Sequence, residues 1–339
     1  LLMILMILVK SKKKYLKLIN SMTSNILITG GAGFIGSRIA IDLLQKNNKV
    51  IVYDNLSTGK KKNLKKVIGK KNFKLIVGDL LDKSKIIKAL KNIDLVYHFA
   101  ANADIKNSFD DPKIDFDQNI VCTFNLLESM RIQDVKKIIF ASSAAIYGEP
   151  NKIPISEKIE IPRQTSLYGA AKLSSENLIS AYCEGYDFKA ICFRFVSLVG
   201  PHYSHGHIID FINQLKINPK KLTVLGDGLQ KKSYLHVDDA INAINLSIDY
   251  NFKSKHIRKS FSVYNLGNKN YVELTSSIKI ILNTMKVKPT ITFTGGKRGW
   301  IGDNPFVFLD TKKISKLGWK PKYTIEKAIE ETVRWLIQR

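Results

Sequence analysis

Short apolar runs and stretches of helical periodicity alternate along the first half of the chain. The runs, rich in Ile, Val, Leu and Phe, lie at residues 25–29, 50–53, 75–77, 95–99 and 138–141. They are too short for helices and are bounded by glycine or polar residues, so each predicts a buried strand. Residues 37–46 repeat their apolar positions with the period of a helix. Strands that alternate with helices predict an α/β fold built on a parallel, doubly wound sheet.

The first predicted strand runs directly into a glycine-rich turn. Gly30, Gly33 and Gly36 follow it at intervals of three residues, and the helical period begins at once. A residue without Cβ lets backbone N–H groups approach a phosphate, and the N-terminus of a helix adds partial positive charge. The order of strand, turn and helix therefore predicts a Rossmann-type site for the pyrophosphate of a dinucleotide.

Further candidate cofactor residues follow the next three strands. Asp54 ends the second strand, 24 residues after Gly30. A carboxylate there can accept hydrogen bonds from both hydroxyls of the adenosine ribose and would repel a 2′-phosphate, which favours NAD over NADP. Asp79, after the third strand, is expected to meet the adenine. Ala100 and Ala101, after the fourth, are small enough for a close approach of the cofactor.

A candidate catalytic group begins at the end of the fifth strand. Ser143 stands there, and Tyr168 and Lys172 lie four residues apart in the helical stretch 166–182. That spacing places the phenol and the ammonium on one face of the helix. An ammonium near a phenol favours the phenolate, which can serve as a base, and Ser143 can hydrogen-bond the substrate oxygen. Taken alone, the same pair would also suit a core or interface position.

Six segments in chain order carry a resemblance to a known family: TGGAGFIGS, YDNLSTG, HFAA, SSAAIYG, YGAAK and GDGLQKKSYLHVDD. From residue 22 onward the chain resembles the extended short-chain dehydrogenase/reductases that act on nucleotide sugars, the NAD-dependent epimerases and dehydratases, and most closely their UDP-glucose 4-epimerase-like branch. The resemblance implies NAD as cofactor and Ser143, Tyr168 and Lys172 as the catalytic triad.

Together with the turn and the strand ends described above, the resemblance implies a full set of candidate cofactor contacts. They are Gly30, Gly33, Phe34, Ile35, Gly36, Asp54, Asn55, Asp79, Leu80, Phe99, Ala100, Ala101, Asn119, Tyr168 and Lys172. By the resemblance, Asn119 braces the site from a neighbouring helix.

The two residues after Ser143 bear on the reaction. Dehydratases of the family carry an Asp-Glu pair there for proton transfer, whereas this chain has Ala144 and Ala145. Alanine cannot move a proton, so we expect a nucleotide-sugar 4-epimerase that works through a transient 4-keto sugar. The sequence leaves open a one-way 4-dehydrogenase or ketoreductase, an epimerase or decarboxylase of UDP-glucuronate, and an NAD-binding regulatory protein.

The second half of the chain is expected to bind the substrate, a nucleotide sugar and above all a UDP-sugar. The resemblance implies contacts from Ser197, Lys232 and Arg298. Ser197 stands where the family usually has asparagine, and Lys232 where it usually has arginine. Residues 193–200 predict one strand, and residues 237–240 predict the start of a packing helix whose two aspartates are structural.

Three regions are expected along the chain. Residues 1–23 predict an extension outside the fold, and residues 24–195 an NAD-binding domain of Rossmann type. Residues 196–339 predict mainly a smaller C-terminal α/β substrate domain, from which some segments return to the first. The resemblance also implies a homodimer that packs the helices at 119–131 and 166–186 into a four-helix bundle.

Charge and cysteine content narrow the functional classes. The chain has 54 basic and 29 acidic residues, a net charge of +25, yet only eight of the basic residues are arginine. Lysine is the poorer residue for bidentate base recognition, and no nucleic-acid-binding motif accompanies it, so we expect no nucleic-acid partner.

The three cysteines form no CxxC pair, which predicts a reducing compartment, the cytoplasm. His202, His205 and His207 lack a carboxylate cluster, so no metal site is expected.

The N-terminus begins with nine apolar residues followed by several lysines. Nine residues fall well short of the roughly 20 that span a bilayer, so no stable membrane insertion is expected. A weak membrane contact remains the alternative to an extension outside the fold.

Overall fold

The structure is a computed structural model that describes residues 23–105, 108–253, 260–304 and 306–338. The expected N-terminal extension, with its apolar run, lies outside the described residues up to position 22. No helix within the described ranges is long and apolar enough to cross a membrane.

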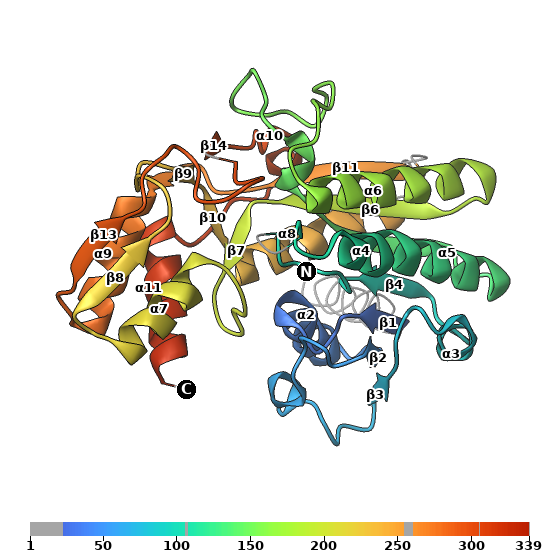
Figure 1. Cartoon of the computed structure of the whole chain (residues 1–339). Coiled ribbons are helices and arrows are strands. Elements are labelled where there is room, and N and C mark those ends of the chain that lie inside the picture. Colours follow the sequence, from blue (N-terminus) through green and yellow to red (C-terminus); the bar gives the residue numbers. More distant parts are fainter. Residues whose placement is uncertain (1–22, 106–107, 254–259, 305, 339) are drawn as a thin grey trace, which may run out of the picture.

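A parallel sheet of seven strands forms the centre of the larger part of the described chain (Figure 1). In spatial order the strands are β11 (Phe261–Leu266), β6 (Lys189–Phe195), β5 (Lys137–Ser143), β4 (Leu95–His98), β1 (Asn25–Thr29), β2 (Lys49–Asp54) and β3 (Phe73–Val77). The chain builds β1 to β3 outward and then returns to add β4 on the other side of β1. The predicted doubly wound Rossmann-type fold is confirmed, with its topological switch between β1 and β4.

Both faces of this sheet are buried, because helices cover each of them. Leu27 and Ile28 are adjacent in β1, point to opposite faces, and are both 0% exposed. One face packs against α2 (Phe34–Gln45) and α8 (Val237–Ile248). The other packs against α3 (Lys83–Ala89), α5 (Cys122–Ile132) and α6 (Leu167–Gly185). Continuous apolar runs therefore suit the inner strands, whereas the edge strand β3 is only partly buried, with Val77 43% exposed.

The helix before β5 is built in three parts. It begins with α4 (Pro112–Asp115), passes through the π-helical segment η2 (Phe116–Val121), and continues as α5. A π-helical turn inserts one extra residue and so releases a backbone carbonyl from the regular helical pattern. Asn119 lies in this turn, and both η2 and α5 contact α6.

The smaller C-terminal part, drawn in yellow to red in Figure 1, consists of short sheets and helices. Its paired strands are β7 (Ser197–Val199) with β10 (Tyr234–His236), β8 (Lys221–Val224) with β13 (Thr290–Phe293), and β9 (Lys231–Lys232) with β12 (Val272–Glu273) and β14 (Phe306–Val307). Its helices are α7 (His207–Ile217), α9 (Leu274–Met285) and α11 (Ile325–Ile337), and α11 packs against both α7 and α9. The short helix α10 (Lys312–Ser315) packs against β11 of the large sheet. Short turns η1 (Lys61–Leu64), η3 (Ala144–Tyr147) and η4 (Asp249–Lys253) complete the described elements.

The prediction of one strand over residues 193–200 is wrong. β6 ends at Phe195 and β7 begins at Ser197, and the two strands belong to different sheets. Val196 still bonds the carbonyl of Leu266 in the large sheet, whereas Ser197 to Val199 pair with β10. Both strands are apolar, so hydrophobicity alone does not reveal where the chain leaves one sheet for the other.

Candidate active site

The glycine turn brings three backbone segments into close contact. Gly30 has a φ of +67°, and a Cβ at this position would lie 2.5 Å from the Ala100 backbone nitrogen. A Cβ on Gly36 would lie 2.4 Å from the Gly30 carbonyl oxygen. Helix α2 begins after Gly33, which supplies no side-chain cap, and its first turn has no acidic residue. The first N–H groups of α2 are thus available to an anion, which fits the pyrophosphate of NAD.

Gly30→Ala tests this close approach. We expect it to lower the free energy of unfolding by about 2 kcal/mol or more, because it adds positive-φ strain to a clash with backbone atoms. It should also weaken NAD binding. Urea unfolding and a fluorescence titration with NAD measure the two effects. Gly69→Ala is the matched control, because Gly69 also has a positive φ, +89°, but has no atom within 4 Å of an added Cβ. Equal losses in the two variants would contradict the close-approach argument.

The carboxyl ends of β2 and β3 present two acidic side chains. Asp54 is 6% exposed, and its carboxylate oxygens accept hydrogen bonds from the backbone N–H groups of Ala32 and Leu56, both at 2.8 Å. Each oxygen keeps a second lone pair, which fits the ribose hydroxyls of NAD. Asp79 accepts a hydrogen bond from the Asn55 side chain at 2.9 Å. Separate hydrogen bonds therefore orient the two carboxylates that are predicted to contact the ribose and the adenine.

The predicted catalytic side chains meet at the carboxyl end of β5. The Ser143 hydroxyl accepts from the Ala145 backbone N–H at 3.1 Å and is hydrogen-bonded to the Tyr168 phenol. Lys172 lies one helical turn beyond Tyr168, is 3% exposed, and donates to the Ala141 carbonyl at 2.9 Å. Its ammonium nitrogen is 5.8 Å from the centre of the Tyr168 ring. The buried phenol and ammonium thus form one cluster with the half-buried hydroxyl of Ser143.

The structure corrects one expectation about this cluster. Burial raises the pKa of the Tyr168 phenol to about 12, although its hydrogen bond with Ser143 acts in the opposite direction. Burial also lowers the pKa of the Lys172 ammonium to about 8, against the raising effect of Asp115. The printed hydrogen bond of the Lys172 ammonium goes to the Ala141 carbonyl, and burial has the largest effect on the pKa of the phenol. A base at Tyr168 needs a further positive charge nearby.

Asn119 lies beside this cluster, in the π-helical turn. Its side chain is 2% exposed and donates to the Asp115 carboxyl at 2.9 Å. Its backbone carbonyl accepts hydrogen bonds from Thr123 at 2.6 Å and from Ser175 of α6 at 3.0 Å. The turn is therefore joined to the helix that carries Lys172.

Sequence reasoning missed Asp115 and Asn102. The Asp115 carboxyl also accepts a hydrogen bond from the Asn102 side chain, at 2.9 Å. Asn102 follows Ala101 directly, and Asp115 precedes Asn119 by one helical turn. An acidic residue four positions before Asn119 was the only available signal, because the contact with Asn102 depends on tertiary packing.

The predicted substrate residues lie in the C-terminal part, and each cation already has a partner. Lys232 donates to the Asp303 carboxyl at 2.8 Å and to the Asn304 carbonyl at 2.6 Å. Arg298 forms an ion pair with Glu149. Ser197 is exposed at the start of β7.

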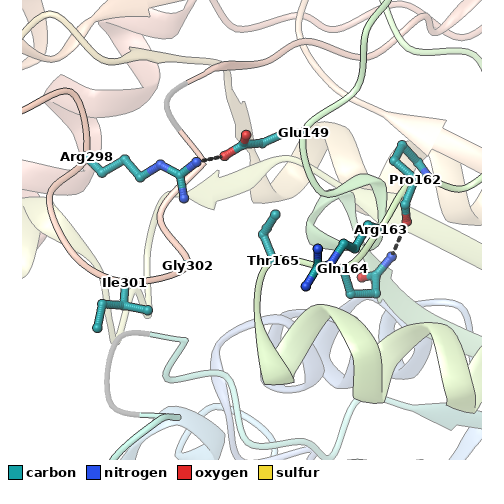
Figure 2. Close-up of a pocket in the computed structure, with 8 residues that line it drawn as sticks. All are labelled: Glu149, Pro162, Arg163, Gln164, Thr165, Arg298, Ile301 and Gly302. Atoms are coloured by element: carbon teal, nitrogen blue, oxygen red, sulfur yellow. Dashed lines mark hydrogen bonds and ion pairs between the residues drawn. The ribbon is translucent and has the colours of Figure 1, made fainter.

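Arg298 lines an open pocket of about 560 Å³ (Figure 2). The other lining residues are Glu149, Pro162, Arg163, Gln164, Thr165, Ile301 and Gly302. Figure 2 shows Arg298 and Arg163 on opposite sides of this space, with Thr165 beside the start of α6. Thr165 precedes Tyr168 by three residues at the start of α6, but Ser143, Tyr168 and Lys172 are not among the residues that line the pocket.

The histidines that were predicted to bind no metal, and the aspartates that were predicted to be structural, form hydrogen bonds within the fold. His202 hydrogen-bonds Ser37 at 2.8 Å, and His207 hydrogen-bonds Ser277 at 2.8 Å. Asp239 accepts from the backbone N–H groups of residues 322 and 323, each at 3.0 Å. Within the described part of the chain no group of three or more His, Cys, Asp or Glu residues could hold a metal ion.

Comparisons with known proteins agree with this geometry. The model of the NAD dependent epimerase/dehydratase family matches residues 26–267. The chain is 31% identical over 327 residues to the UDP-glucose 4-epimerase of Halalkalibacterium halodurans, covering 91% of this chain and 95% of that protein. Thermus thermophilus UDP-glucose 4-epimerase, solved with NAD, has a TM-score of 0.79 at 31% identity, covering 92% of this chain and 99% of that chain.

A structure named for another sugar is equally similar in fold. The UDP-glucuronic acid 4-epimerase of Bacillus cereus, solved with UDP-glucuronic acid and NAD, has a TM-score of 0.83 at 26% identity, covering 93% of this chain and 99% of that chain. The family match spans the glycine turn, the strand ends and the helix with Tyr168 and Lys172. It confirms both the resemblance seen in the motifs and NAD as the cofactor. The chain belongs to the NAD dependent epimerase/dehydratase family.

Proposed function

We propose that the protein is an NAD-dependent nucleotide-sugar 4-epimerase that interconverts UDP-glucose and UDP-galactose. The observation that carries the proposal is the cluster at the carboxyl end of β5, in which the half-buried Ser143 lies beside the buried Tyr168 and Lys172. The two residues after Ser143 are Ala144 and Ala145, whose side chains carry no acidic or basic group. The site can therefore move one proton at one sugar oxygen, which is the proton chemistry that 4-epimerisation requires.

Each member of the cluster has a distinct task. Tyr168 accepts the proton of the sugar 4-hydroxyl and later returns it, while Ser143 hydrogen-bonds the same oxygen in its hydroxyl and carbonyl forms. Lys172 keeps a positive charge close to Tyr168. When bound, NAD supplies the acceptor and then the donor of the hydride at C4, and its positive charge favours the phenolate. The cofactor ends each cycle as it began, so no added oxidant is needed.

The nucleotide end of the substrate is assigned to the C-terminal part. Arg298 and Lys232 carry the positive charge expected at the substrate pyrophosphate, and a guanidinium can bind phosphate oxygens in a bidentate manner. On substrate binding, the Arg298 guanidinium would leave its exposed ion pair with Glu149 and bind the phosphate instead. Loss of this ion pair costs little free energy, because surface ion pairs are weak. Contacts with the nucleotide would hold the substrate in the site while the 4-keto sugar rotates.

A UDP-uronic acid 4-epimerase is the second candidate. Arg163 and Arg298 both line the pocket, so a sugar carboxylate could bind one guanidinium while the pyrophosphate binds the other. Matched Arg163→Gln and Lys158→Gln variants test this role, because Lys158 is a surface cation outside the pocket. We expect Arg163→Gln to raise the KM for UDP-glucuronate at least tenfold more than the KM for UDP-glucose if the second candidate is correct.

A panel of nucleotide sugars separates the candidates. The purified protein is incubated without added NAD with UDP-glucose, UDP-N-acetylglucosamine and UDP-glucuronate, and the epimers are separated by chromatography. We expect UDP-galactose from UDP-glucose at the highest kcat/KM. NADH formed in proportion to consumed sugar would instead indicate a one-way dehydrogenase. Cofactor binding without turnover of any sugar would indicate a regulatory protein.

The homodimer expected by resemblance belongs to this proposal. Large apolar side chains are exposed along η2, α5 and the end of α6: Phe116, Phe124, Ile132 and Tyr186. We expect a dimer in size-exclusion chromatography with light scattering, and a monomer after Phe124→Glu, because a buried charge opposes association. Ile217→Glu is the control, since Ile217 is 87% exposed on α7. A dimer that survives Phe124→Glu would exclude this interface.

A further inference from the structure

The segment between Asp54, at the end of β2, and Asp79, after β3, contains eight lysines and no acidic residue. The chain as a whole has 54 basic and 29 acidic residues, so this segment departs from its average. All eight lysines are exposed: Lys60, Lys61, Lys62, Lys65, Lys66, Lys70, Lys71 and Lys74. None of them belongs to a lysine ion pair of the described structure. The segment therefore carries a dense positive charge that no neighbouring carboxylate balances.

Buried anchors hold the second half of this segment in a fixed shape. Leu64 and Val67 are 0% and 1% exposed and belong to the core. The backbone N–H of Val67 donates to the Leu64 carbonyl at 2.9 Å, and that of Lys70 donates to the Val67 carbonyl at 3.1 Å. The Asn72 side chain donates to the Asn48 carbonyl at 2.8 Å. The lysines between these anchors are thus carried on a folded surface.

An exposed apolar side chain lies among the lysines of this half. Ile68 is 51% exposed. Five lysines flank it in the chain and form what we call the lysine patch: Lys65, Lys66, Lys70, Lys71 and Lys74. Anionic lipid headgroups attract clustered lysines, and an apolar side chain among them can enter the headgroup region.

A nucleic acid fits the same surface less well. The segment between Asp54 and Asp79 has no arginine and one aromatic residue, Phe73, which is half-buried in β3. Arginine forks and stacked aromatic rings are what proteins use to bind bases. The lysine patch therefore offers charge without base contacts, which suits a lipid surface.

The lysine patch leads into the amino end of β3, the strand at one edge of the large sheet (Figure 1). The strands of this sheet are parallel. The amino end of β3 therefore lies at the opposite end of the sheet from the carboxyl ends, where Asp54 and Ser143 lie. A membrane bound through the patch would leave the catalytic cluster open to substrate.

The chain enters the fold at this same end of the sheet. β1 begins one residue after Ser24, whose carbonyl accepts a hydrogen bond from the Lys49 N–H at 3.0 Å. The residues before β2 in turn meet those before β3 through Asn48 and Asn72. In sequence, residues 1–22 are nine apolar residues followed by a stretch with five lysines. Apolar residues and basic charge that meet at one end of a protein both strengthen membrane binding.

We propose that the lysine patch docks the protein on an anionic membrane surface, as a peripheral contact that does not cross the bilayer. Its ammonium groups contact the lipid phosphates, and Ile68 enters the headgroup layer. The attraction is electrostatic, so added salt weakens it. This inference does not depend on the proposed epimerase function.

Vesicle flotation of the full chain, loaded with NAD, tests the proposal. The vesicles contain phosphatidylglycerol and phosphatidylcholine in equal amounts, or phosphatidylcholine alone. The test variant replaces four lysines of the patch by glutamine: Lys65, Lys66, Lys70 and Lys71. Lys60 to Lys62 stay, because the Lys60 N–H bonds the Ala32 carbonyl of the glycine turn at 3.1 Å. We expect binding only to the anionic vesicles, and a partition constant at least tenfold lower in the variant, since each lysine near such a surface contributes roughly fivefold.

A second quadruple variant is the matched control. It replaces four exposed lysines of the C-terminal part by glutamine and so removes the same net charge: Lys220, Lys221, Lys279 and Lys288. We expect its partition constant to stay within about twofold of the wild type, because charges far from the membrane are screened. An NAD titration and the urea unfolding midpoint verify that both variants are folded.

Each remaining outcome contradicts the proposal. Equal losses in the two variants would assign binding to net charge, and full binding by the patch variant would assign it to another segment. A wild type that stays off anionic vesicles at low salt also overturns the inference. Binding to poly(U) RNA without binding to vesicles would assign the patch to nucleic acid. Because no readout involves a sugar, failure of the proposed epimerase function leaves this test unaffected.

Discussion

Tyr168→Phe is expected to lower kcat for 4-epimerisation by roughly 10³-fold, within the range measured when a general acid–base group is removed. The variant loses only the phenol oxygen, so the ring still fills its buried position against Ser143 and α6. NAD affinity and the unfolding midpoint should therefore change little. The measurement is the initial rate of UDP-galactose formation, taken with an NAD titration of the same preparation.

Tyr182→Phe is the matched control for this variant. Tyr182 lies on the same helix, but its hydroxyl donates to Glu128 at 2.6 Å, away from the catalytic cluster. We expect its kcat to stay within a factor of about two of the wild type, since no reacting atom is involved. A Tyr168→Phe rate within tenfold of the wild type would remove Tyr168 from the proton-transfer step.

Glu176→Gln is expected to cause the largest loss of stability. Glu176 and Arg194 form a bidentate ion pair whose side chains are 3% and 8% exposed. Arg194 also donates to the Tyr147 hydroxyl at 2.8 Å. Removing the carboxylate leaves a buried guanidinium without its counter-charge, which costs about 3–5 kcal/mol. Urea unfolding monitored by circular dichroism measures the change.

Two further variants isolate the cause of this loss. Glu128→Gln breaks the exposed pair with Arg131 and should cost no more than about 1 kcal/mol. The double variant Glu176→Leu/Arg194→Met removes both buried charges and should recover most of the lost stability, since paired burial of charge is seldom better than good apolar packing. A double variant as unstable as Glu176→Gln would show that the loss comes from packing.

Rules that apply to short sequence segments predicted where those parts of the candidate site that lie within a single segment would be. The glycine turn, Asp54 after β2, and the Tyr168–Lys172 pair each follow from a strand edge or a helical repeat, and their positions are read from spacing alone. The strand split at Val196 could not be read in the same way, because both halves are apolar and only their pairing partners differ.

Electrostatic properties of the site were harder to predict than its positions. Helical spacing places Lys172 near Tyr168, but the pKa of the phenol depends on how much of it the rest of the fold removes from water. The contact of Asp115 with Asn102 likewise joins two elements through tertiary packing. The same limit applies to Lys232, whose partner Asp303 lies 71 residues away in the chain.

The most direct test of the central claim follows the hydrogen at C4. UDP-galactose carrying deuterium at C4 is incubated with the protein without added NAD, and the product is analysed by mass spectrometry and NMR. If Tyr168 moves only the hydroxyl proton while C4 gives up and regains its own hydride, UDP-glucose should retain the deuterium at C4 and no NADH should accumulate. Loss of the deuterium to water, or its transfer to released NADH, would contradict the account.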